Sequence, residues 1–145
     1  MFKLNSQQKR QARIVSLQAI YARELQGSEL DDTCDFMIDV DKPPSDKIIK
    51  YGKQLSNLIF MHSKELDKLI ISRSKNWDFD RITLIDKLIL RMALVEMVYV
   101  DDVPPKVSIA EGVEIAKQFS TEDSSGFING ILDSVYNDTI KGKTL

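Results

Sequence analysis

The sequence predicts an all-α protein of six to seven helices. Apolar residues recur at helical spacing in nearly every segment between turn signals, whereas the alternation typical of strands does not stand out. Glycine and proline separate these segments, as they do at helix ends. A length of 145 residues is the usual size of one domain and suffices to bury a core. We therefore expect one helical domain, with a natural division near residue 75 into halves of about three helices each.

The first helix is expected over residues 6–25, and Gly27 ends it. Its large apolar residues follow helical spacing along one stripe and are Ile14, Leu17, Tyr21 and Leu25. Arg10 lies one turn before Ile14 on the same stripe. A stripe of this kind is more often a packed face than an exposed one.

A second, weaker helix is expected in SELDDTCDFMIDV, residues 28–40, and the prolines at 43 and 44 then form a loop. This segment contains Cys34, the only cysteine, which has no second thiol for an internal disulfide or a metal. We interpret it as a small apolar residue in a protein of a reducing compartment.

The third helix is expected to begin after Ser45, which suits an N-cap, and to continue to about residue 72. That length is unusual for one helix. Ser63, with Glu65 and Leu66 after it, is suited to restarting a turn, so we expect a bend or break between Met61 and Ser63.

The stretch NWDFDR, residues 76–81, is expected to form a joint, and Asp78 or Asp80 is expected to cap the next helix. Apolar positions cover much of the circumference of this fourth helix, which predicts a central, largely buried element. Its apolar positions are Ile82, Ile85, Leu88, Ile89, Met92, Val95, Met97 and Tyr99.

The last two helices have clear start signals. Pro105 suits the first turn of the fifth helix, and Thr121 suits the cap of a sixth that runs to about Asn137. The fifth helix is expected to direct inward Ile109, Val113, Ile115, Ala116 and Phe119. The tail KGKTL is expected to be frayed.

No arrangement in the sequence predicts catalysis or a cofactor. A nucleophile needs an adjacent base and a metal needs several converging ligands, and neither pattern is found. The only histidine, His62, lies in an apolar helical context and is more simply a packing or surface residue. No glycine-rich loop follows a strand, and no apolar run or signal sequence indicates a membrane or secretion. We therefore expect a cytoplasmic protein that is not an enzyme, with neither cofactor nor metal.

The charge is distributed unevenly. Residues 1–25 contain five bases and one acid and so carry +4, although the whole chain carries −2. Lys9, Arg10 and Arg13 fall within an arc of about 100° near the start of the first helix. Cations at a helix N-terminus are unfavourable by themselves, but together with the free N–H groups they form a site for phosphate. The alternative is a solvated basic end.

The segment STEDSSGFINGILD, residues 120–133, also has two interpretations. Gly126 and Gly130 lie four residues apart and expose backbone on one side of the sixth helix or allow another element to approach closely. The structural interpretation is helix packing. The functional one is a polar edge beside Phe127, against which a second molecule lies.

Four stretches form a specific pattern: KRQARIVSLQAIYARE, NWDFDR, LIDKLILRMALVEM and DVPPKVSIAEGVEIAKQFSTEDSSGFINGILD. Together they resemble the NusB family of bacterial transcription antitermination factors, in register from about residue 9 to residue 133 and most weakly between 26 and 75. The resemblance implies two packed three-helix bundles, about residues 6–74 and 80–138. It also implies binding of boxA RNA in ribosomal RNA leader transcripts jointly with NusE, a small-subunit ribosomal protein, which helps RNA polymerase resist termination.

The resemblance also implies roles for individual residues. The positions that correspond to RNA contacts are Lys9, Arg10, Arg13, Tyr21, Asp123 and Phe127. Asp86 occupies the position of an acidic residue that faces NusE, and an acid suits a basic ribosomal protein. Gln11 replaces a family arginine, which removes one charge. Some family members form a homodimer that covers the RNA surface.

Two other functions remain open from the sequence. One is a helical protein–protein adaptor whose basic end contacts an acidic protein without RNA. The other is a NusB-like domain of an RNA cytosine methyltransferase, although the sequence contains neither a cofactor-binding loop nor a catalytic cysteine motif.

Overall fold

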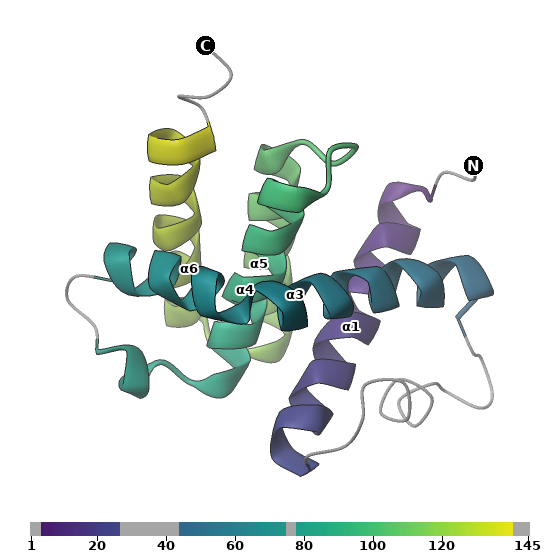
Figure 1. The fold of residues 1–145 in the computed structure, drawn as a ribbon, viewed down its shortest axis with the longest axis horizontal. Coiled ribbons are helices and arrows are strands. Elements are labelled where there is room, and N and C mark those ends of the chain that lie inside the picture. The colour runs from purple at the N-terminus through teal and green to yellow at the C-terminus, as the bar shows by residue number, and fades with distance from the viewer. Residues whose placement is uncertain (1–3, 27–43, 75–77, 141–145) are drawn as a thin grey trace. The chain divides into compact units, whose positions relative to one another are not determined.

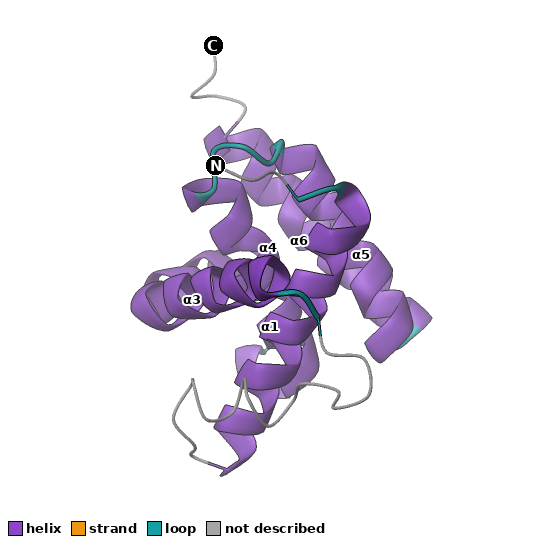
Figure 2. Cartoon of the chain, turned by 90° about the vertical axis from the view of Figure 1, so that its right-hand side faces the viewer, coloured by secondary structure: helices purple, strands orange, loops and turns teal. Residues whose placement is uncertain are grey.

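The computed structural model describes residues 4–26, 44–74 and 78–140, and every regular element in these ranges is helical (Figure 2). The elements in chain order are α1 (Ser6–Gln26), α3 (Asp46–Arg73), the 3-10 helix η1 (Phe79–Arg81), α4 (Leu84–Tyr99), α5 (Pro105–Phe119), α6 (Glu122–Val135) and the π-helical turn η2 (Tyr136–Ile140), as Figure 1 shows. This confirms the predicted all-α class. The helix expected over residues 28–40, with Cys34, and the tail after residue 140 lie outside the described residues.

The chain divides into two compact units, residues 1–60 and residues 61–145. The division falls within α3, so that the two parts of this helix belong to different units. Each unit is described separately below. The arrangement as two three-helix bundles stays a prediction.

In the first unit, small residues allow α1 and α3 to approach closely. A Cβ atom added to Gly52 of α3 would lie 3.1 Å from the carbonyl oxygen of Ala12 on α1. Nearby, the hydroxyl oxygens of Ser16 and Ser56 are 2.7 Å apart, and Ser56 donates a hydrogen bond of 2.9 Å to the carbonyl oxygen of Gly52. Both serine side chains are fully buried. Hydrogen bonding therefore accompanies close packing at this crossing.

The packed face of α1 differs from the predicted stripe. Of the four stripe residues, Leu17 is buried, whereas Tyr21 is 37% exposed and Leu25 is 63% exposed. The buried positions are mostly smaller and include Ala12, Val15, Ser16, Ala19 and Ile20. The predicted stripe is therefore packed only in part, and the closest approach to α3 involves small residues.

α3 is one continuous helix from Asp46 to Arg73. The helix is therefore not broken between Met61 and Ser63, as the sequence had allowed, while a bend there stays a prediction. Sharp breaks are usually caused by proline or by glycine and serine pairs, and this helix contains no proline and only Gly52 as glycine. A single serine within a run of helix-favouring residues does not interrupt it.

In the second unit, α4 packs against α5 and α6, which also pack against each other (Figure 1). Ten of the sixteen residues of α4 are buried, as expected for a central helix. Its cap is Thr83, whose hydroxyl accepts a hydrogen bond of 3.3 Å from the amide of Asp86. Asp78 instead caps η1, where its carboxylate accepts from the amide of Asp80. The capping role predicted for Asp78 or Asp80 at α4 is wrong because η1 intervenes.

The starts of α5 and α6 are as predicted. Pro105 is the first residue of α5, and Thr121 caps α6 by accepting a hydrogen bond of 3.1 Å from the amide of Ser124. Gly112 of α5 lies where a Cβ atom would be 3.3 Å from both Ala93 of α4 and Leu132 of α6. A residue without a side chain therefore suits this contact between the three helices.

Polar pairs connect α3 to later elements of the second unit. Arg91 of α4 binds Asp67 of α3, and Arg73 at the end of α3 pairs with Asp138 of η2.

No helix within the described ranges is both long and apolar enough to cross a membrane.

Candidate functional site

The start of α1 combines a capped helix end with basic side chains. Asn5 and Gln8 exchange backbone-to-side-chain hydrogen bonds of 2.9 and 2.8 Å, which form a reciprocal cap. The first turn contains no acidic residue. Directly after it come Lys9, which is half-buried, and Arg10, which is exposed. The helix dipole and two cations therefore act together at this end of α1.

Arg13 does not share the exposure of Arg10. Only 2% of Arg13 is exposed, although its position on the helical wheel predicts a common arc with Lys9 and Arg10. Tyr21, three turns after Arg10, is 37% exposed and presents part of its ring to solvent. Of the predicted residues on α1, Arg10 and Tyr21 are thus the most exposed.

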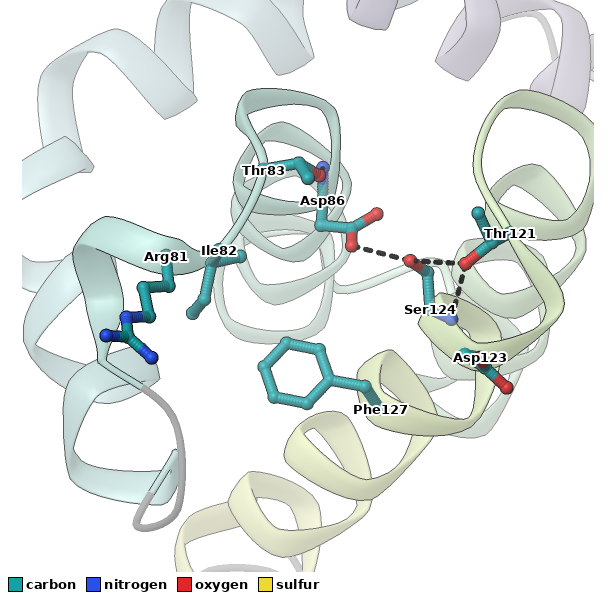
Figure 3. A pocket seen from close by; sticks show the side chains of 8 residues that line it. All are labelled: Arg81, Ile82, Thr83, Asp86, Thr121, Asp123, Ser124 and Phe127. Atoms are coloured by element: carbon teal, nitrogen blue, oxygen red, sulfur yellow. Dashed lines mark hydrogen bonds between the residues drawn. The ribbon is translucent and has the colours of Figure 1, made fainter.

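In the second unit, the other three predicted residues line one cavity of about 220 Å³ (Figure 3). Its lining comes from η1, the start of α4 and the start of α6, and consists of Arg81, Ile82, Thr83, Asp86, Thr121, Asp123, Ser124 and Phe127. Figure 3 shows the Phe127 ring between Ile82 and Ser124, whereas the Asp123 carboxylate points away from Asp86. The cavity therefore combines an aromatic wall with hydroxyl and carboxylate groups.

Asp86 is largely enclosed at the inner side of this cavity. Only 5% of the residue is exposed. Ser120 donates a hydrogen bond of 2.8 Å to one carboxylate oxygen, and Ser124 donates one of 2.8 Å to the other. Buried carboxylates are stable only when such donors satisfy them. Asp86 therefore has a structural role that the sequence did not predict.

Sequence reasoning missed several residues of this cavity. Arg81 ends the predicted joint, and Ile82 and Thr83 follow it directly before α4; no motif in the sequence assigns these three residues to a site. Ser120 and Ser124 lie 34 and 38 residues from Asp86, so no local pattern relates them to it. The signals in the sequence are Thr121, which suits a helix cap, and the polar edge beside Phe127 in residues 120–133.

His62 has a surface role within the second unit. Its ring stacks on that of Tyr99, with centroids 4.1 Å apart and planes inclined by 14°, and its Nδ1 atom lies 3.5 Å from Glu65. Tyr99 donates a hydrogen bond of 3.2 Å to the same carboxylate. Partial burial is the larger cause, and this hydrogen bond a further one, that raises the pKa of Tyr99 above its ordinary value.

Within the described part of the chain, no three His, Cys, Asp or Glu residues are grouped to hold a metal ion.

Comparison with known proteins covers nearly all of the residues described above. The sequence profile of the NusB family matches residues 10–137. The chain belongs to the NusB family. The match includes most of α1 and all of α3 to α6, so both compact units are part of the family domain.

Two transcription antitermination proteins NusB illustrate the similarity. That of Chloroherpeton thalassium is 39% identical over 135 residues, which cover 93% of this chain and 64% of the relative. That of Natranaerobius thermophilus is 52% identical over 68 residues, which cover 47% of this chain and 49% of the relative. The matched regions thus span less than two thirds of the length of these relatives.

Solved NusB structures have the same fold. A structure of NusB from T. maritima matches with a TM-score of 0.81 and 27% identity over 94% of both chains. A structure of the antitermination factors NusB and NusE in complex with dsRNA matches with a TM-score of 0.81 and 20% identity, over 92% of this chain and 98% of the other. At the latter identity the likeness concerns the fold alone.

Proposed function

We propose that this chain is a transcription antitermination factor that binds boxA RNA of ribosomal RNA leader transcripts jointly with NusE and helps RNA polymerase resist termination. Its role is binding, without a catalytic step or cofactor, and it acts in the cytoplasm. Membership of the NusB family supports the proposal, as does the solved complex of NusB, NusE and RNA with the same fold.

The observation that carries the RNA part is the start of α1. The capped first turn of α1 contains no acidic residue and is followed by Lys9 and Arg10, so a helix N-terminus lies next to two basic residues. A helix N-terminus beside basic side chains favours a phosphate group. We assign phosphate contacts first to Lys9 and Arg10. Arg13 is nearly buried, so we expect it to act on RNA less directly.

Exposed aromatic rings suit the bases of single-stranded RNA. Tyr21 on α1 is partly exposed, and Phe127 on α6 lines the cavity of the second unit. Stacking on such rings is the usual way in which proteins hold unpaired bases. Asp123, exposed in the first turn of α6, is suited to accept hydrogen bonds from base amino groups. We therefore assign base contacts to Tyr21, Phe127 and Asp123.

We place the NusE contact on the surface around Asp86. The acid suits a basic ribosomal protein, although the 5% exposure leaves only the edge of the carboxylate that lines the cavity for direct contact. A partner at this edge would also meet Arg81 and Thr83, which line the same cavity.

The proposal is tested by fluorescence anisotropy of a labelled boxA-like single-stranded RNA, titrated with the protein at several salt concentrations, with and without NusE. We expect NusE to tighten binding. Each phosphate contact with single strands contributes about 0.7 to the salt slope, so Lys9→Ala with Arg10→Ala should reduce it by about 1.4. The matched control is Lys64→Ala with Lys68→Ala, which removes the same charge from exposed positions of α3.

Three results would contradict the proposal. An unchanged slope in the Lys9 and Arg10 variant, or equal reductions in both double variants, would remove α1 from the RNA surface. Capture of NusE without RNA binding at any salt concentration would favour the protein–protein adaptor instead.

A further inference from the structure

One carboxylate connects three helices of the second unit. Asp86 lies in the first turn of α4, Ser120 directly follows α5, and Ser124 lies in the first turn of α6. Ser120 donates to Oδ1 of Asp86 and Ser124 donates to Oδ2, each over 2.8 Å. We call these three residues the Asp86 bridge. It fixes the short connection between α5 and α6 against the start of α4.

The direction of each hydrogen bond in this group is determined by proton counting. An ionised carboxylate only accepts, so the single hydroxyl proton of Ser124 is directed to Asp86. Ser124 Oγ then accepts from the hydroxyl of Thr121, over 3.0 Å, and Thr121 accepts from the Ser124 amide over 3.1 Å. Figure 3 shows the resulting chain from Thr121 through Ser124 to Asp86. Hydrogen bonds in such chains strengthen one another.

The bridge lies next to the residues of α6 that we assign to RNA. Asp123 precedes Ser124, and Phe127 follows it by three residues, which places Phe127 on the adjacent turn of the same side of the helix. The Phe127 ring lines the cavity together with Asp86 and Ser124. Any movement of the first turn of α6 away from Asp86 would therefore change the positions of both Asp123 and Phe127.

We propose that Asp86 is a positioning residue for the RNA surface: through Ser124 and Ser120 it holds the first turn of α6 so that Asp123 and Phe127 meet RNA in a fixed geometry. This inference rests on the proposed function and adds a role to the NusE contact implied by the resemblance. Both carboxylate oxygens are already bonded and the residue is nearly buried, so its stronger interactions are internal. A preorganised surface binds more tightly because less ordering is needed on binding.

The test uses serine variants, which leave Asp86 itself unchanged. Ser124→Ala removes one donor to the carboxylate, Ser124→Thr retains the hydroxyl, and Ser134→Ala is a matched control in the last turn of α6. Three quantities are measured for each variant. They are RNA affinity in the presence of NusE, NusE capture without RNA, and amide hydrogen exchange over residues 122–127. We expect Ser124→Ala to weaken RNA binding about tenfold and to speed exchange in the first turn of α6. NusE capture is measured so that the RNA titrations are made with NusE at a saturating concentration for each variant. Ser124→Thr should restore RNA binding, and Ser134→Ala should not alter it.

A double-mutant cycle shows whether Asp86 acts through Ser124. If it does, Asp86→Asn should weaken RNA binding in the wild-type background and much less in the Ser124→Ala background, both measured with NusE at a saturating concentration so that weaker NusE capture does not contribute. Additive losses would overturn the inference. So would unchanged RNA affinity or unchanged hydrogen exchange in folded Ser124→Ala protein, because a merely stabilising bridge lowers the free energy of unfolding without altering the affinity of the folded state. Failure of the wild-type protein to bind RNA with NusE would overturn the proposed function, and this inference with it.

Discussion

The guanidinium group of Arg91 binds the carboxylate of Asp67 through two parallel hydrogen bonds, from Nε over 2.7 Å and from an Nη atom over 2.9 Å. The pair joins α4 to α3 within the second unit, and its side chains are only 13% and 25% exposed. Two-point contacts of this kind depend on the planar shape of arginine and on partial exclusion of water.

We expect Arg91→Lys to lower the free energy of unfolding by about 1–2 kcal/mol, although the charge is retained, because lysine cannot form both bonds. Asp67→Asn should cost about 2–3 kcal/mol, since it leaves the guanidinium without its counter-charge. Urea unfolding measures both. Lys117→Ala, which breaks an exposed pair with Glu114, is the control and should change stability by less than about 0.5 kcal/mol. Equal effects of Arg91→Lys and the control would show that the second hydrogen bond is unimportant.

The buried serines of the first unit form a second asymmetric contact. Ser56 donates its proton to the carbonyl oxygen of Gly52, so the bond between the two hydroxyls must be donated by Ser16. Ser56→Ala therefore removes the acceptor of a fully buried donor and should cost about 1–3 kcal/mol, whereas Ser16→Ala leaves Ser56 bonded and should cost about 1 kcal/mol or less. Chemical denaturation of both single variants and the double variant measures the difference and the coupling between them. A larger loss for Ser16→Ala than for Ser56→Ala would reverse the inferred direction of donation.

Local signals determine how much of the fold the sequence predicts. Pro105 and Thr121 mark the starts of α5 and α6 because a fixed φ angle and a capping hydroxyl act within one turn of the chain. The packed face of α1 depends instead on how closely another helix approaches. There, Ala12 and Ser16 are buried while the larger Tyr21 and Leu25 remain exposed, an outcome that apolar spacing alone does not predict.

The candidate site shows the same distinction between local sequence signals and contacts made by tertiary packing. The resemblance directed attention to Asp86, Asp123 and Phe127, and the structure places all three around one cavity. The resemblance did not indicate that Asp86 is bonded to Ser120 and Ser124, because these contacts join residues that are far apart in the sequence. Such contacts follow from tertiary packing, which a single sequence does not encode in any local pattern.

Two glycines of the second unit should respond in opposite ways to a methyl group. Gly112→Ala brings a Cβ atom to 3.3 Å from both Ala93 and Leu132, closer than ordinary contact, whereas a Cβ atom at Gly130 meets nothing within 4 Å. We expect Gly112→Ala to lower the free energy of unfolding by about 1 kcal/mol, since overpacking exceeds the gain in helix propensity. Gly130→Ala should raise it by about 0.5–1 kcal/mol. Thermal unfolding of both variants provides the comparison, and stabilisation by Gly112→Ala would show that the three helices adjust without strain.

The Tyr99 hydroxyl should titrate above the ordinary range of tyrosine. Partial burial, followed by the hydrogen bond to Glu65 and the negative charge of that carboxylate, raises its pKa because each disfavours the phenolate. The neutral form is thus favoured in the folded state, so this contribution to stability is present below the ordinary tyrosine pKa of about 10 and is lost as the pH rises from there through the folded-state pKa. Ultraviolet absorbance can follow the titration of the four tyrosines, with Tyr99→Phe identifying the late component. Glu65→Gln should lower the pKa of Tyr99, since it removes the charge and weakens the acceptor, whereas Glu114→Gln, an exposed position on α5, should not. A late component that is unaffected by Glu65→Gln would assign the raised pKa to burial against the stacked His62 ring alone.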